Sequence, residues 1–118
     1  MPWQAIQHNE GVPCRAAFGQ PAPVASFYGT SAGEGFGAYL HFVGDVDGDG
    51  TGDFALGSIL ANNGSMLEAG RVIVYSGATR APIFPNPFFG ASAGERFGVS
   101  IDGADIDNDG FSDIVVGA

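Results

Sequence analysis

Residues 45–53 of the chain read DVDGDGTGD, and residues 105–113 read DIDNDGFSD. Both stretches follow the pattern D-x-D-x-D-G-x-x-D and lie 60 residues apart; together they hold eight of the 13 acidic residues. Ahead of each stretch, the sequence of residues 29–37 recurs at 90–98, after 61 residues. A period near 60 that covers most of the chain predicts stacked supersecondary units, each too small to bury its own hydrophobic face.

The residue types in the two stretches predict two cation sites. Alternate carboxylates on a tight loop converge on one centre, and Gly50 and Gly110 at the sixth position permit the φ > 0 turn that wraps the chain round an ion. Oxygen ligands at this density suit Ca²⁺, which takes 6 to 8 of them. We expect four carboxylates per site, the backbone carbonyl of Thr51 or Phe111, and water. The carboxylates are Asp45, Asp47, Asp49 and Asp53 in the first loop and Asp105, Asp107, Asp109 and Asp113 in the second.

Two other interpretations of these loops fit less well. An EF-hand needs a Glu at position twelve, where this chain has Leu56 and Val116, and a helix after the loop, where apolar strand-like residues follow. Solvated Asx turns explain one Asp-Gly pair but not two copies of four acids at fixed spacing. Without an ion, clustered carboxylates repel by roughly 1 to 4 kcal/mol per close pair, so we expect each loop to be ordered only with metal bound.

The rest of the period predicts an all-β fold. Twenty Gly and 7 Pro leave few places for a helix. We expect strands at 36–43, 54–57 and 71–75, and a proline-bearing edge strand at about 83–89. Four-stranded antiparallel meanders at this period favour propeller blades over a sandwich.

Composition excludes several classes of partner and fold. The net charge is −9 and the four cations are scattered Arg residues, which argues against nucleic acid binding. No apolar run is long enough to span a membrane, and no signal peptide is visible at Met1. Cys14 is the only cysteine, so an internal disulfide is excluded, and we expect it to be buried.

Phe36-Gly37 and Phe97-Gly98, each followed by an aspartate loop, a short apolar strand and Gly57-Ser58 or Gly117-Ala118, resemble the FG-GAP repeat. This repeat builds the β-propellers of integrin alpha subunits and of many bacterial extracellular proteins. The resemblance implies that the calcium loop joins the first two strands of a blade, and it carries the ligand roles onto the eight Asp residues. It also implies an extracellular or cell-surface location. Ser58-Ile59 departs from the family's Ala-Pro, which affects the turn after the second strand.

Counted against the family's blade order, the chain divides into three parts. Residues 1–29 are expected to be the third and fourth strands of a blade, 30–90 a complete blade, and 91–118 the first two strands of the next. Two blades cannot close and would expose sheet edges. The other blades come either from a longer chain or from a head-to-tail homo-oligomer, in which three chains would give six blades and four would give eight.

The functional expectation is a non-enzymatic structural, adhesion or protein-interaction module. His8 and His41 have no counterpart in the other repeat, and we expect His41 to be a packed or hydrogen-bonded strand residue. Glu34 and Glu95 recur, which favours a turn or hydrogen-bonding role over acid–base chemistry. The alternative is a non-catalytic or glycan-binding propeller module of a secreted hydrolase.

Overall fold

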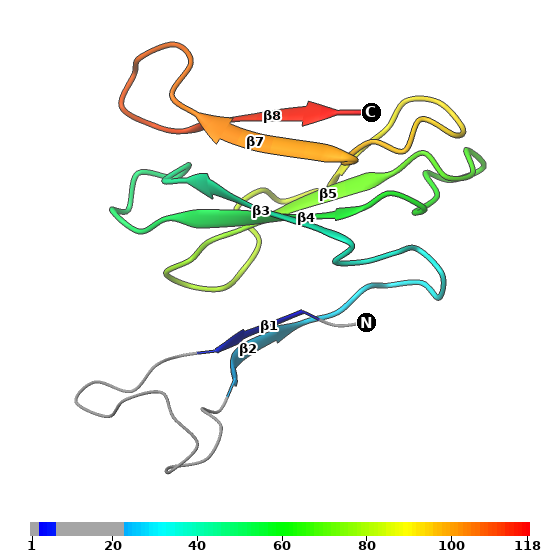
Figure 1. Cartoon of the computed structure of the whole chain (residues 1–118), viewed down its shortest axis with the longest axis horizontal. Helices are drawn as coiled ribbons and strands as arrows, with labels where there is room; N and C mark the ends of the chain where they lie inside the picture. The colour runs from blue at the N-terminus through cyan, green and yellow to red at the C-terminus, as the bar shows by residue number, and fades with distance from the viewer. Residues whose placement is uncertain (1–2, 7–22) are drawn as a thin grey trace.

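The computed structural model describes residues 3–6 and 23–118, and these residues form eight strands in three antiparallel sheets (Figure 1). A two-stranded sheet has the order β1-β2, a four-stranded sheet the order β3-β4-β5-β6, and a second two-stranded sheet the order β7-β8. The expected all-β class is confirmed; no helix that could cross a membrane occurs in the described part of the chain. The strands are β1 (Trp3–Ile6), β2 (Pro23–Phe27), β3 (Tyr39–Gly44), β4 (Asp53–Ser58), β5 (Arg71–Tyr75), β6 (Phe88–Phe89), β7 (Ser100–Ala104) and β8 (Asp113–Gly117).

The central sheet is a meander whose strands pair in chain order. The predicted strand at 71–75 matches β5, where β-branched and aromatic residues favour the extended conformation. The strand expected from residue 36 begins only at Tyr39, because Gly35 and Gly37 adopt positive φ and the Ala38 N–H donates to the Gly35 carbonyl. A tight turn therefore occupies the first residues of the predicted strand.

The fourth strand is shorter than predicted. Only Phe88–Phe89 joins the ladder, opposite Arg71 and Val72 of β5, although it does lie at the edge of the sheet as expected. Ahead of it, the Ile83 N–H donates to the Val74 carbonyl at 2.9 Å. Pro85 and Pro87 have no N–H to donate, which explains why the pairing is not continuous.

Both faces of the central sheet are covered, as Figure 1 shows by the three stacked layers. One face packs against the β7-β8 sheet through a buried cluster that includes Val43, Val74 and Ile101. The other face packs against β2, where Phe27 contacts the ring of Tyr75 with centroids 4.6 Å apart. The central sheet is therefore the middle layer of a stack.

The outcomes for the remaining single residues differ. Glu34 and Glu95 have the expected hydrogen-bonding role, since each accepts hydrogen bonds from the backbone N–H groups of the preceding turn. His41 is a strand residue of β3, as expected, but its side chain is exposed, so the packed alternative is wrong. Cys14 and His8 lie outside the described residues.

Candidate cation-binding loops

Each aspartate loop connects two neighbouring antiparallel strands. The first loop joins β3 to β4 and the second joins β7 to β8, and the last Asp of each loop is the first residue of the following strand. Gly50 and Gly110 have φ of 85° and 92°, which confirms the expected turn at the sixth position. The two loops thus occupy the same place in successive sheets.

Backbone N–H groups surround the first carboxylate of the first loop. Asp45 accepts from the Gly48 and Asp49 N–H groups through Oδ1, at 2.8 and 3.1 Å, and from the Gly50 N–H through Oδ2 at 2.9 Å. These bonds fold residues 45–50 round one side chain. Oδ2 accepts only one of these bonds, so it keeps a lone pair for a cation, whereas Oδ1 accepts two.

Asp53 anchors the other end of the first loop. Its side chain is fully buried; Oδ2 accepts from the Val46 N–H at 2.8 Å and Oδ1 from the Gly77 N–H at 3.0 Å. Because Gly77 follows β5, Asp53 ties the loop to the end of the third strand of the sheet.

The second loop repeats the main bonds of this pattern. Asp105 accepts from the N–H groups of Asp109 and Gly110 at 3.0 and 2.9 Å. Asp113 accepts from the Ile106 N–H at 2.9 Å, as Asp53 does from Val46. Loops 60 residues apart with these shared bonds form two corresponding candidate sites.

The structure brings together three of the four predicted carboxylates of each loop. Oxygens of Asp45, Asp47 and Asp53 lie within 4.8 Å of one another, and so do those of the second-loop group Asp105, Asp107 and Asp113. Asp49 and Asp109 are outside these groups and accept the N–H of Thr51 and Phe111 at 2.8 and 2.9 Å. The four-carboxylate ligand set, with the carbonyls of Thr51 and Phe111, stays a prediction.

The electrostatics of the loops favour a cation. Local desolvation raises the pKa of Asp47, and the negative charges of Asp53 and Asp49 raise it further. Asp107 has a raised pKa mainly from the same desolvation, with Asp109 and Asp113 adding to it. The Asp45 pKa is lowered, chiefly by the hydrogen bond from the Gly50 N–H.

No arginine of the described residues forms an ion pair with a loop aspartate. The two ion pairs within the described ranges are Arg71–Glu34 and Arg96–Glu68, and neither includes a loop aspartate. Grouped carboxylates without a protein cation, all of them hard oxygen donors, match the ligand preference of Ca²⁺. The residues present therefore fit the implied ion.

The two loops also contact each other, which sequence reasoning missed. The Ser112 N–H donates to the Asp45 carbonyl at 2.9 Å. The Phe111 ring lies against Gly48, where an added Cβ would overlap it. The sequence held a signal for this contact in the two positions where the loops differ in size. The second loop has Phe111 where the first has Thr51, and the first loop has Gly48 where the second has Asn108.

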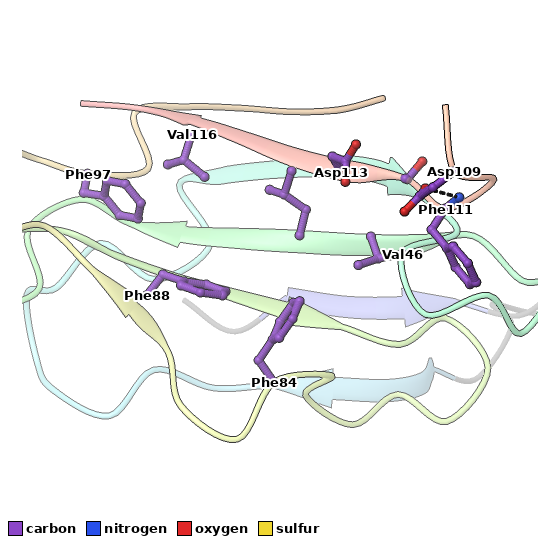
Figure 2. Close-up of a pocket in the computed structure, with 10 residues that line it drawn as sticks. Val46, Phe84, Phe88, Phe97, Asp109, Phe111, Asp113 and Val116 are labelled. Carbon is purple, nitrogen blue, oxygen red and sulfur yellow. Dashed lines mark hydrogen bonds between the residues drawn. The ribbon is translucent and has the colours of Figure 1, made fainter. Parts of the chain in front are cut away.

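Beside this contact lies an open apolar pocket of about 630 Å³ between the central sheet and β8. Figure 2 shows Phe84 and Phe88 on one side and Val116 on the other, with Phe111 at the end near the aspartates. The pocket places apolar side chains beside the second loop.

Comparison with known proteins identifies integrin alpha chains as relatives. The chain is 37% identical over 90 residues to mouse integrin alpha-X, a match that covers 70% of this chain and 7% of the integrin. It is 34% identical over 104 residues to human integrin alpha-IIb, covering 82% of this chain and 9% of that protein. No protein-family model matches the chain. The chain spans less than a tenth of the length of these relatives, and the similarity supports an integrin-like β-propeller fragment.

Proposed function

We propose that this chain is a calcium-binding FG-GAP β-propeller segment that serves as a structural, adhesion or protein-interaction module. The observation that carries the proposal is the pair of aspartate loops with matching hydrogen bonds and grouped carboxylates. The similarity to integrin alpha chains supports the adhesion or interaction role. No catalytic residue is assigned.

Two Ca²⁺ ions are held in this proposal, one by each loop. Asp45, Asp47, Asp49 and Asp53 hold the first ion, with the Thr51 carbonyl; Asp105, Asp107, Asp109 and Asp113 hold the second, with the Phe111 carbonyl. When bound, the ion supplies positive charge that offsets the repulsion among the carboxylates. The chain's own part is to fix the connection between neighbouring strands, as the Asp53 bonds to Val46 and Gly77 do.

The partners follow from the division into blades. In the proposal, residues 1–29 supply the third and fourth strands of one blade, 30–90 a complete blade, and 91–118 the first two strands of the next. Most of 1–29 lies outside the described residues. The missing blades come from a longer chain or from further copies joined head to tail. The proposed location is the cell surface or outside the cell, where the calcium concentration is high enough to fill loops of low affinity.

The test is a melting experiment with and without calcium. We expect Asp49→Ala and Asp109→Ala to lower the melting temperature in millimolar calcium and to leave it unchanged in chelator, because each removes a ligand of an ion that binds only the folded state. Asp102→Ala, at an exposed position on β7 outside both loops, is the matched control and should behave alike in both buffers. Equal shifts for the loop variants in calcium and in chelator would contradict calcium binding.

A further inference from the structure

The contact between the two loops joins a ligand-bearing segment of each. The backbone carbonyl of Asp45 accepts a hydrogen bond from the Ser112 N–H. The side chain of the same residue accepts hydrogen bonds from the N–H groups of Gly48, Asp49 and Gly50. Movement of residue 112 therefore moves the residue round which the first loop is folded. The second loop bonds the backbone carbonyl of Asp45 and takes no lone pair from its carboxylate.

The Phe111 side chain reinforces the same contact. Its ring lies on Gly48, which has φ of 77° and donates its N–H to Asp45 Oδ1. Gly48 stands between two predicted ligands, Asp47 and Asp49, so the ring limits the movement of the segment that carries both. A side chain at position 48 would overlap the ring, and only glycine allows this packing.

Phe111 is in turn held by its own loop. Its N–H donates to Asp109 Oδ1 at 2.9 Å, the bond drawn as a dashed line in Figure 2. With Asp109 as a ligand, as proposed above, an ion in the second loop would order this side chain and, through the bond, the backbone that sets the direction of the Phe111 ring. The path from one site to the other is Asp109, Phe111 and Gly48, with Ser112 and Asp45 in parallel.

We propose that Phe111 and Ser112 are positioning residues for the first loop, so that an ion bound in the loop at 105–113 raises the affinity of the loop at 45–53. The inference rests on the proposed function, because it concerns two sites for the same ion. Coupling between binding sites is reciprocal, so an ion in the first loop raises the affinity of the second by the same factor. Such couplings are typically about fivefold to 150-fold, and we expect at least about fivefold here.

Calorimetric titration of the full chain with CaCl₂ tests the coupling. The double variant Asp105→Asn with Asp107→Asn can bind an ion only in the first loop. The double variant Asp45→Asn with Asp47→Asn can bind an ion only in the second loop. If the sites are coupled, the overall constant for binding two ions to the wild type exceeds the product of the two single-site constants, by about fivefold or more. An overall constant equal to that product overturns the inference while leaving the proposed function intact; a wild type that binds no ion overturns both.

A side-chain variant tests the route of the coupling. Phe111→Ala keeps the backbone carbonyl at position 111. In this variant, the overall constant for binding two ions should be close to the product of the two single-site constants, each measured with Phe111→Ala also present. Ile106→Ala is the matched control, since it removes an exposed apolar side chain from the same loop and should leave the coupling factor unchanged. Phe111→Leu serves where the alanine variant loses its circular dichroism signal. An unchanged coupling factor in a folded Phe111 variant contradicts the role of the ring.

Discussion

A buried ion pair joins the turn before the central sheet to its third strand. Arg71 donates from Nη2 to Glu34 Oε1 at 2.7 Å and from Nη1 to Thr30 Oγ1 at 2.8 Å. Both charged side chains are almost completely buried. The Thr30 N–H also donates to Glu34 Oε1 at 3.1 Å, so the carboxylate is held from two sides. The pair fixes where the chain leaves β2 and enters β3.

Removal of the arginine leaves the carboxylate buried without its counter-charge. We expect Arg71→Met to lower the free energy of unfolding by about 3 to 5 kcal/mol, because breaking a buried pair strands the remaining ion. Urea unfolding measures the change. Arg96→Met is the control: its pair with Glu68 is 3.8 Å long and about half exposed, so the expected loss is at most about 1 kcal/mol. Equal decreases in the free energy of unfolding for Arg71→Met and Arg96→Met would contradict a larger contribution from the buried pair.

Sequence reasoning found one half of this pair. Glu34 recurs as Glu95 in the repeat, which indicated a structural role, and both residues accept backbone N–H groups. The partner of Glu34 was not predicted, because Arg71 lies 37 residues away and nothing local in the sequence pairs them. Contacts between residues so far apart in the sequence depend on how the strands and turns are arranged in space.

At the scale of elements, β7 lies directly against β3 with little space between the backbones. Gly103 of β7 faces the backbone of Val43, and an added Cβ there would overlap the Val43 carbonyl. Its φ is not in the left-handed region, so the lack of a side chain matters for space alone. The close approach lets the β7-β8 sheet cover the buried cluster round Val43.

A side chain at position 103 should push the two sheets apart. We expect Gly103→Ala to cost about 1 to 3 kcal/mol of stability in thermal or urea unfolding, the usual range for overpacking. The matched control is Gly52→Ala, where an added Cβ meets nothing within 4 Å and φ needs no glycine. Both are measured in chelator. A Gly103 variant as stable as the Gly52 variant would contradict the close contact between β3 and β7.

The predictability of the elements depends on how local their causes are. The strand at 71–75 and the turns at Gly50 and Gly110 were predicted because branched residues and sixth-position glycines act within a few residues. The late start of β3 results from turn geometry at Gly35 and Gly37, which the alternating pattern does not show. The positions of the aspartate loops came from the repeat, whereas the Phe111–Gly48 contact arises only when one sheet is laid on another.

At the scale of the whole molecule, some apolar side chains are left uncovered, both at the β3 edge of the central sheet and on the β7-β8 sheet. Phe42 is 77% exposed and Val115 of β8 is 51% exposed. No other strand of the described residues pairs with the far edge of β8. An unpaired edge beside exposed apolar side chains is a surface on which another sheet can pack and pair.

We expect the chain to associate in millimolar calcium, because the free edge of β8 and its exposed face gain pairing and burial from another chain. Light scattering after gel filtration gives the molar mass. Three or four chains would indicate a closed ring of six or eight blades, and a broad distribution would indicate open-ended association.

Val115→Lys should reduce the mass to that of the monomer with the same circular dichroism, since association would bury the new charge. Leu67→Lys, 62% exposed on the connection between β4 and β5, should leave the mass unchanged. A monomeric wild type contradicts the expected association. If both lysine variants still associate, the contact does not involve the exposed face of β8, and the open apolar pocket beside β8 becomes the next surface to alter.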